Sequence, residues 1–211
     1  MEDKEQSKRL ICVIGCGGIG SFLASSLANL RSNRQLIDKN GSHGVIILYD
    51  PDEVEQKNLL YQDFTEDDMF LNKAEVLATR HKVVSMPTRV SRFKNIVQSS
   101  EDLIVLCVDN VETRKQLFKE CSKGLANPWI DLRCHGRAIA AYARSPKNSL
   151  EFMTESLPKE VQEGSDSCQI ASDILSRSTQ VGNRIVAAIG CQMILNVFRG
   201  VPFSTRFEYE F

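Results

Sequence analysis

Short apolar runs alternate with amphipathic stretches along most of the chain. Apolar runs rich in β-branched residues predict buried strands at 10–14, 45–49, 103–108 and 129–132. Between these runs, apolar residues recur at the spacing of one helix face and predict helices at 18–30, 72–84 and 111–123. Because helix and strand alternate, the pattern favours an α/β fold, with a mainly parallel sheet and helices on both of its faces.

Three segments interrupt this alternation in the first half of the chain. Residues 31–44 carry Ser, Asn, Lys and Gly and predict a surface excursion. Residues 50–68 are rich in carboxylates and predict an irregular loop that faces a ligand. A short strand is expected near 88–93.

The second half of the chain predicts a different arrangement. Residues 136–143 predict a strand antiparallel to its neighbour, and residues 206–211 alternate like a closing strand. The polar segment 146–168 is expected to form a mobile crossing loop. An apolar stretch at 179–199 predicts a long helix.

Composition and charge limit the classes of protein that this chain can be. The 211 residues are 42% hydrophobic and 25% charged, which predicts one globular domain spanning 1–211. With 26 basic and 27 acidic side chains the net charge is −1, so no global field points to nucleic acid or to an anionic membrane. We expect neither as a partner, and the partner must be inferred from local sites.

The cysteines and the first residues suggest a location. The chain has seven cysteines, an odd number, and none forms a Cys-x-x-Cys pair, which favours a reducing compartment. Residues 1–9 are polar and lead directly into the first predicted strand, unlike a secretory signal or a membrane span. The expected location is therefore cytoplasmic.

A glycine-rich turn follows the first predicted strand. Its glycines are Gly15, Gly17, Gly18 and Gly20, and a helix of small residues comes next. Such a turn offers free backbone N–H groups at the positive end of a helix, where phosphate can bind. By itself this signal indicates an anionic group without distinguishing a dinucleotide from ATP.

An acidic residue ends the second predicted strand. Asp50 is placed to accept hydrogen bonds from ribose hydroxyls, although it follows Gly20 by 30 residues, whereas such motifs usually have a spacing of about 20. The excursion at 31–44 absorbs the difference. The alternative is that Asp50-Pro51-Asp52 forms only a turn.

Two further positions carry charge at the ends of predicted elements. Lys73 opens a helix and is a candidate point charge for a triphosphate, or else a solvated helix lysine. Asp109 follows an apolar strand and is a candidate for Mg²⁺ binding, or else a helix cap. Both roles fit together if Asn110 caps the following helix.

Five ordered motifs resemble the ThiF, MoeB and ubiquitin-activating-enzyme superfamily, most of all its short, stand-alone ThiF-like members. They are the glycine loop at 15–21, Asp50-Pro-Asp52-x-Val54, Asn58-Leu59 followed by Gln62, Asn72-Lys73-Ala74, and Val108-Asp109-Asn110 followed by Arg114. The resemblance extends over most of the chain and implies a Rossmann-like α/β fold with added antiparallel strands toward the C-terminus.

The resemblance implies an activity. It is the ATP-dependent adenylation of the C-terminal carboxylate of a ubiquitin-like protein, a small sulfur-carrier-like protein or a peptide, with ATP and Mg²⁺ as cofactors. Lys73 would act on the phosphates and Asp109 on Mg²⁺. The other cofactor-binding residues implied are Gly15, Gly17, Gly18, Gly20, Asp50, Asp52, Asn58, Gln62 and Asn110.

The resemblance also places a cysteine. Cys168, between the predicted crossing loop and the last helix, resembles the position that becomes acylated after adenylation in some relatives. A polar setting near a helix start favours an accessible thiolate. The alternative is an incidental loop cysteine.

The chain departs from the family pattern at several positions. Tyr61 stands where the Asn-Leu-x-Arg-Gln motif carries arginine. Residues 1–9 do not predict the N-terminal helix from which many members send an arginine into the partner subunit's site; Arg133, or a subunit supplied by another protein, is a candidate replacement. The cysteine pairs that bind structural zinc in many relatives are absent from the sequence, so we expect no zinc site.

Three hypotheses follow. The first is an adenylyltransferase, expected from the resemblance to be a homodimer. The second, motivated by Tyr61, is a catalytically impaired ThiF-like scaffold or heterodimer subunit. The third is an NAD-dependent oxidoreductase, suggested by the glycine loop and Asp50 alone.

Overall fold

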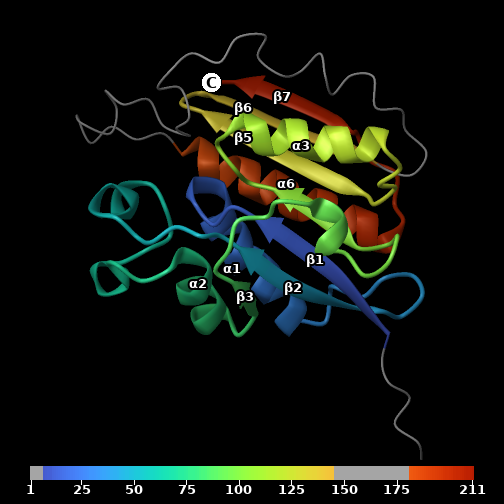
Figure 1. The fold of residues 1–211 in the computed structure, drawn as a ribbon, viewed down its shortest axis with the longest axis horizontal. Helices are drawn as coiled ribbons and strands as arrows, with labels where there is room; N and C mark the ends of the chain where they lie inside the picture. Colours follow the sequence, from blue (N-terminus) through green and yellow to red (C-terminus); the bar gives the residue numbers. More distant parts are fainter. Residues whose placement is uncertain (1–6, 145–180) are drawn as a thin grey trace, which may run out of the picture.

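The computed structural model describes residues 7–144 and 181–211, which form a seven-stranded sheet with helices on both faces (Figure 1). The strands are β1 (Lys8–Ile14), β2 (His43–Tyr49), β3 (Val84–Met86), β4 (Leu103–Leu106), β5 (Trp129–His135), β6 (Ala138–Arg144) and β7 (Arg206–Glu210). The described α-helices are α1 (Gly18–Ser32), α2 (Lys73–His81), α3 (Val111–Ser122) and α6 (Gly182–Arg199). Short 3₁₀ helices, η1 (Gln56–Leu60), η2 (Glu66–Asp68) and η3 (Phe93–Asn95), lie in the connections.

The order of the strands creates a binding position at the centre of the sheet. The order is β3-β2-β1-β4-β5-β6-β7, and the first five strands in this order are parallel. The chain runs outward from β1 through β2 to β3 and then returns to β4 on the other side of β1. In an open α/β sheet, ligands bind outside the carboxyl ends of the strands at such a reversal.

The last two strands extend the sheet in the opposite direction. β6 is antiparallel to β5, and β7 is antiparallel to β6. These pairings confirm the antiparallel strands predicted at 136–143 and 206–211, and with them the Rossmann-like fold class. All five residues of β7 are exposed.

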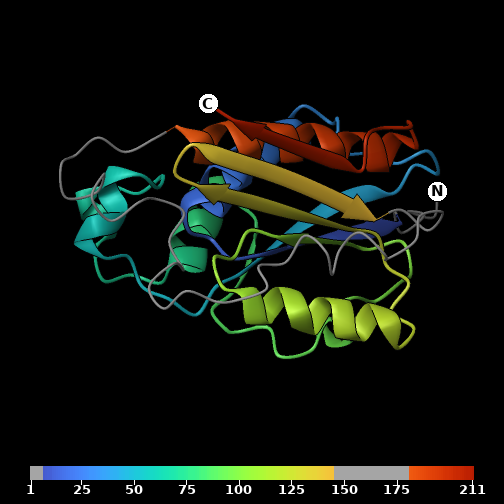
Figure 2. The same cartoon turned by 90° about the horizontal axis from the view of Figure 1, so that it is seen from above.

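Helices cover both faces of the sheet (Figure 2). α1, α2 and α6 share one face, and α3 lies on the other. Alternate residues of β1 serve the two layers, because Ile11 and Val13 join the α1 side while Cys12 and Ile14 join the α3 side. β1 is therefore buried on both faces, as its continuous apolar run predicted.

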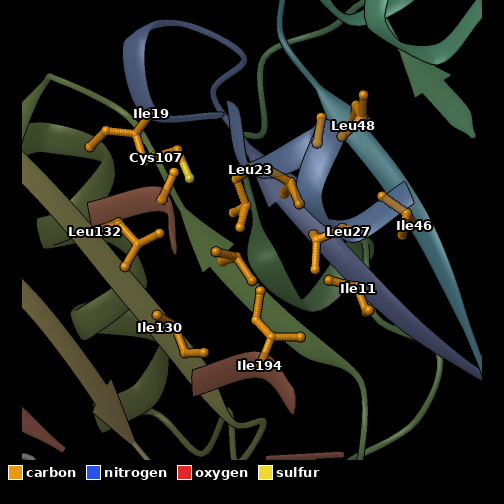
Figure 3. Close-up of a cluster of buried hydrophobic side chains, with 14 of the residues drawn as sticks. Ile11, Ile19, Leu23, Leu27, Ile46, Leu48, Cys107, Ile130, Leu132 and Ile194 are labelled. Atoms are coloured by element: carbon orange, nitrogen blue, oxygen red, sulfur yellow. The ribbon is translucent and has the colours of Figure 1, made fainter. Parts of the chain in front are cut away.

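The larger core cluster joins elements from both ends of the chain (Figure 3). Leu23 and Leu27 of α1 pack with Ile11 of β1 and Ile194 of α6. α6 approaches the sheet closely at Gly190, where an added Cβ would lie 2.4 Å from the Leu132 Cδ1 atom of β5. The last helix thus anchors the first strand and the glycine turn that follows it.

The strand predicted at 88–93 is wrong, because β3 occupies Val84–Met86 instead. α2 ends at His81 rather than Val84, since Lys82 takes a left-handed conformation (φ 54°) that turns the chain directly into the sheet. Pro87 follows β3 and has no N–H to donate, so strand pairing stops there. The apolar residues of this segment, Val90 and Phe93, are buried on the α3 side of the sheet without forming a strand.

Two predictions fall partly or wholly outside the described residues. The crossing loop predicted at 146–168 lies there, as do the first two residues of the helix predicted at 179–199, whose remainder is α6. Among the described helices, none combines the length and the apolar character needed to cross a membrane.

The close approach of α6 to β5 gives a stability prediction. Gly190→Ala places a Cβ 2.4 Å from Leu132 Cδ1, and Leu132 is fully buried, so the helix must move. We expect the free energy of unfolding to fall by about 1–3 kcal/mol in urea denaturation, although alanine favours a helix by about 1 kcal/mol over glycine. Gln192 is exposed on the same helix, and Gln192→Ala should change the free energy of unfolding by less than about 0.5 kcal/mol. A Gly190→Ala protein as stable as the unmodified chain would contradict this packing.

Candidate functional site

A cleft opens at the carboxyl ends of β1, β2 and β4, where the strand order reverses. It is bordered by the turn after β1, the segment after β2 including η1, the start of α2, the segment after β3 and the turn after β4. Ten of the residues expected to bind the cofactor line this single cleft: Gly15, Gly17, Gly18, Asp50, Asp52, Asn58, Gln62, Lys73, Asp109 and Asn110.

The glycines of the turn after β1 serve different purposes. Gly15 has φ +93°, and a Cβ there would lie 2.9 Å from the Cys107 carbonyl oxygen. A Cβ at Gly20 would lie 1.9 Å from the Gly15 carbonyl oxygen, so Gly20 allows α1 to pack against the turn. Gly20 does not line the cleft. Its contribution is to the shape of the loop.

The amino end of α1 lacks the caps that the neighbouring helices have. Among the described residues, no side chain caps the first turn of α1, and that turn contains no acidic residue. By contrast, Asn72 caps α2 by accepting the Glu75 N–H at 3.1 Å, and Asn110 caps α3 by accepting the Thr113 N–H at 2.9 Å. An uncapped helix start that borders a cleft suits an anionic group such as phosphate.

Asp50 holds the glycine turn in place. Its Oδ2 accepts the Cys16 N–H at 2.6 Å, and its Oδ1 accepts the Asp52 N–H at 2.9 Å. Asp50 is buried, and burial raises the pKa of its carboxyl above the ordinary value, opposed by these two hydrogen bonds and by Lys73. Asp50 therefore does take part in a turn, as the alternative interpretation of Asp50-Pro51-Asp52 predicted. Both of its carboxylate oxygens accept backbone hydrogen bonds there.

Lys73 reaches the cleft from the first residue of α2. The residue is buried, and its Nζ lies 3.8 Å from Oδ2 of Asp52, whose own side chain is well exposed. The Asn72 side chain donates to the Asp50 carbonyl at 3.0 Å and so joins the start of α2 to the end of β2. Lys73 is therefore held at the cleft wall rather than solvated on an outer helix face.

The residues of η1 and the turn after it form the opposite wall. Asn58 is buried, and its Oδ1 accepts the Glu55 N–H at 2.8 Å. Gln62 lines the cleft, and its buried Oε1 has no hydrogen-bond partner among the described residues. Asn183 of α6 lies against Gly18, and its Oδ1 is likewise without a described partner. Two amide groups with spare hydrogen-bonding capacity thus lie beside the glycine turn.

Asp109 lines the cleft directly after β4, and Arg114 fixes the backbone that carries it. The Arg114 Nη2 donates to the Val108 carbonyl at 2.6 Å, and its Nη1 makes longer contacts of 3.4 Å with the carbonyls of Asp109 and Asn110. Arg114 is buried and does not line the cleft. It is a positioning residue for the turn of Asp109.

Arg114 is itself anchored by a buried carboxylate of β5. Its Nε donates to Asp131 Oδ1 at 3.0 Å, and Arg133 binds Asp131 Oδ2 at 2.6 Å. The Arg133 guanidinium also lies over the Tyr142 ring, 4.5 Å from its centroid. Arg133 is therefore engaged by β5 and β6 and does not line the cleft, unlike the replacement cation that the sequence suggested.

The cleft fits a nucleotide and Mg²⁺ by its chemistry. The uncapped start of α1 and Lys73 suit phosphate, and the exposed carboxylates of Asp52 and Asp109 suit a hard cation. Within residues 7–144 and 181–211 there is no group of three or more His, Cys, Asp or Glu residues that could hold a metal ion. Mg²⁺ usually binds through one or two carboxylates together with substrate phosphates, which is what this cleft offers.

Sequence analysis missed part of the cleft. Lys57 borders it from η1, and Thr88, Arg89 and Val90 border it from the segment after β3; Tyr61, which the sequence had marked as a departure from the family motif, also lies in its wall. Lys57 had a signal, because it is the only basic residue among the many carboxylates of 50–68. Arg89 was missed because the sequence assigned 88–93 to a strand rather than to a segment that borders the cleft. Cys168 lies outside the described residues.

The sequence profile of the ThiF family matches residues 4–207, which is nearly the whole chain. The chain belongs to the ThiF family. The glycine turn, Lys73 and Asp109 all lie within the matched part of this ThiF chain.

Curated relatives share part of this chain. The ubiquitin-like modifier-activating enzyme 5 of Culex quinquefasciatus is 24% identical over 161 residues, which are 67% of this chain and 38% of that protein. The protein of the same name from Drosophila willistoni is 28% identical over 155 residues, which are 64% of this chain and 35% of that protein. The alignments thus cover little more than a third of these relatives.

Solved structures share the fold. The microcin C7 biosynthetic enzyme MccB in complex with N-formylated MccA aligns with a TM-score of 0.69 at 21% identity, over 96% of this chain and 61% of that chain. E. coli MccB with ATP gives a TM-score of 0.65 at 20% identity over 96% and 60%. PaaA gives a TM-score of 0.61 at 16% identity over 96% and 64%.

The Arg114 contacts predict a large effect of a single substitution. Arg114→Ala leaves the carbonyls of the Asp109 turn without their donor and removes one of two partners of the buried Asp131. We expect the free energy of unfolding to fall by about 3 kcal/mol in chemical denaturation. Lys119→Ala, exposed on the same helix, should stay within about 0.5 kcal/mol of the unmodified chain. Equal effects of the two substitutions would mean that the contacts of Arg114 with Asp131 and with the Asp109 turn do not stabilise the fold.

Proposed function

We propose that this ThiF chain is an ATP-dependent adenylyltransferase that activates a carboxylate as an acyl adenylate. The observation that carries the proposal is the meeting of the uncapped start of α1, Lys73 and Asp109 at one cleft of a ThiF-family fold. These groups lie between Gly18 and Asp109 and come from three separate elements, so their convergence is not a product of local sequence.

The reaction needs charge stabilisation more than proton transfer. One oxygen of the substrate carboxylate attacks the α-phosphorus of ATP, the bond from that phosphorus to the oxygen bridging the β-phosphorus breaks, and pyrophosphate leaves with the electron pair. A C-terminal carboxylate has an ordinary pKa of about 3.3–3.7, so it is already ionised at neutral pH. No general base is required of this chain.

The cleft residues then have separate roles. The N–H groups at the start of α1 and the Lys73 ammonium stabilise phosphate charge. Asp109, with Asp52 nearby, would hold Mg²⁺, which supplies neutralisation of the triphosphate charge when bound. Asp50 keeps the glycine turn in the conformation that exposes those N–H groups.

The proposed substrate is the C-terminus of a ubiquitin-like protein, a small sulfur-carrier-like protein or a peptide. Relatives named as ubiquitin-like modifier-activating enzymes support the first class. The fold shared with MccB, solved in complex with N-formylated MccA, supports considering a peptide. The final acceptor of the acyl group, whether sulfur, protein or RNA, stays open.

The sequence suggested two other functions for this chain. A catalytically impaired scaffold or heterodimer subunit is motivated by Tyr61, an uncharged side chain in the wall of the cleft. An NAD-dependent oxidoreductase rested on the glycine turn and Asp50, and membership of the ThiF family gives it no support. Lys73 and Asp109 together suit Mg²⁺-triphosphate better than a dinucleotide.

ATP–pyrophosphate exchange tests the proposal directly. The unmodified chain, Lys73→Ala and Asp109→Ala are assayed with Mg²⁺ and a panel of ubiquitin-like proteins and C-terminal peptides. We expect substrate-dependent exchange that falls at least about 100-fold in both variants, because each removes charge stabilisation from the reacting phosphate. Lys119→Ala serves as the control and should exchange like the unmodified chain.

The same assay separates the alternatives. A chain that binds ATP, exchanges with no substrate of the panel and gains exchange in Tyr61→Arg would support the impaired scaffold. Nicotinamide binding without ATP binding would support the oxidoreductase.

Transfer to a cysteine after adenylation is the finer part of the proposal, with Cys168 as the candidate. The other cysteines are buried or half-buried. Burial raises the pKa of Cys12 to about 12 and the pKa values of Cys134 and Cys191 to about 11. A thiol with such a pKa is almost entirely protonated at neutral pH and is a poor nucleophile.

Thiol alkylation of the native chain gives a prediction. At neutral pH, iodoacetamide should modify Cys168 first and leave Cys12 and Cys134 unmodified, because their buried thiols stay protonated. Peptide mass spectrometry after quenching reads each site, and the urea-unfolded chain is the control in which all should react. Labelling of Cys12 ahead of Cys168 would remove the case for Cys168 as acceptor.

We further propose a cytoplasmic location and a homodimer, with a heterodimer as the alternative. The location rests on cysteine usage, and the dimer rests on the family. Analytical ultracentrifugation of the purified chain, with and without ATP, measures the assembly state.

A further inference from the structure

The cleft holds more positive charge than the sequence motifs supply. Lys57 and Arg89 line it in addition to Lys73. Lys73 is buried in the wall, whereas the Lys57 side chain is 57% exposed and can move. Four carboxylates, those of Asp50, Asp52, Glu55 and Asp109, line the same cleft. Two of them pair with the lysines, Asp52 with Lys73 and Glu55 with Lys57.

Lys57 is placed by a rigid piece of backbone. It is the second residue of η1, and the ends of the first turn of η1 are tied together by the Glu55 and Asn58 backbones. The Asn58 N–H donates to the Glu55 carbonyl at 2.8 Å, while the Asn58 side chain accepts the Glu55 N–H at 2.8 Å. Lys57 therefore starts from a fixed point on the cleft wall, with a flexible side chain beyond it.

In the structure, Glu55 is the ion-pair partner of Lys57. The Lys57 Nζ lies 2.8 Å from Glu55 Oε2, and the two side chains are 57% and 60% exposed. Exposed pairs of this kind contribute only about 0.2–1 kcal/mol. A terminal phosphate group, with a charge of about −1.5 to −2 at neutral pH, competes for the ammonium at little cost when it enters the same cleft.

The surroundings of Lys57 favour its charged form. The hydrogen bond that its ammonium donates to Glu55 raises the pKa of Lys57 above its ordinary value, and the nearby Tyr61 and Asp109 add to the rise. Asp109 is the proposed Mg²⁺ residue, so Lys57 lies within electrostatic range of the metal side of the nucleotide. Tyr61, at the end of the same 3₁₀ helix, supplies no positive charge there.

We propose that Lys57 binds the outer phosphates of ATP, and that Glu55 holds its ammonium in the free protein and gives it up when the nucleotide enters. The proposal rests on the proposed function and adds a residue to it. No bond is made or broken in this exchange, in which an ammonium–carboxylate pair is replaced by an ammonium–phosphate pair.

This exchange predicts that Lys57 discriminates nucleotides by their phosphates. AMP lacks the β- and γ-phosphates, so it should bind without using Lys57. Glu55 should oppose the binding of ATP, because its carboxylate competes for the same ammonium and repels the phosphates. Lys57 and Glu55 substitutions should therefore move ATP affinity in opposite directions and leave AMP affinity nearly unchanged.

Calorimetric titration of the full chain with ATP and with AMP, both with Mg²⁺, tests this. Lys57→Ala should weaken ATP binding about 10-fold, the effect of losing one charged hydrogen bond, and change AMP binding less than twofold. Glu55→Gln should tighten ATP binding about two- to fivefold, the worth of an exposed pair. Lys57→Arg, which keeps the charge, should stay within about threefold of the unmodified chain.

A matched control comes from α3. Lys115 and Glu112 form an ion pair of 2.9 Å with 48% and 78% exposed side chains, and neither residue lines the cleft. Lys115→Ala should leave both affinities unchanged. Thermal denaturation of every variant verifies that each is folded before its affinity is compared.

The outcomes distinguish this inference from the function on which it rests. ATP binding that is equal in Lys57→Ala and the unmodified chain overturns the role of Lys57 alone. An equal loss of AMP and ATP affinity in Lys57→Ala also overturns it, because the residue would then support the cleft as a whole. An unmodified chain that binds neither nucleotide overturns the proposed function together with the inference.

Discussion

The carboxylate of Asp50 joins the turn after β1 to the end of β2, and the shape of the cleft depends on that junction. One oxygen accepts the Cys16 N–H and the other accepts the Asp52 N–H. If the first bond were lost, the glycine turn would lose the side chain that holds its Cys16 N–H beside the start of α1, whose first turn no side chain of the described residues caps. Burying a carboxylate is costly unless it is hydrogen-bonded, and here the backbone that it organises supplies both bonds.

A second buried carboxylate performs the corresponding task on the other side of β1. Asp131 of β5 holds Arg114, and Arg114 holds the carbonyls of the turn that carries Asp109. Charged groups thus shape the cleft from both sides: Asp50 lines it, whereas Asp131 and Arg114 act from behind its wall. Lys73 and Asp109 can then present their charges from fixed backbone, which is the condition for electrostatic stabilisation of a reacting phosphate.

Local sequence predicted most of the elements and most of the cleft. Continuous apolar runs predicted β1 and β4, which are buried on both faces, and helical periodicity predicted α1, which buries one face. The wrong strand at 88–93 shows the limit, since the left-handed Lys82 and the placement of Pro87 decide where β3 begins and ends. Asp131 lies 17 residues from Arg114 in the chain, and the packing of α3 against the sheet brings them together. Such contacts depend on the assembled fold and have no periodic signal.

The pairing of Arg114 with Asp131 also constrains how this sequence can change over time. Each residue is buried and charged. Replacing Asp131 alone leaves the Arg114 guanidinium without its carboxylate partner, and replacing Arg114 alone leaves one oxygen of Asp131 without its cation, while Arg133 still binds the other. A lineage can lose the pair only through a coordinated change of both, because their energetic effects are coupled. Among diverged chains, arginine and aspartate at these two positions should therefore persist or disappear together. The presence of both residues would indicate an intact Asp109 turn even in chains whose glycine motif can no longer be recognised in the sequence.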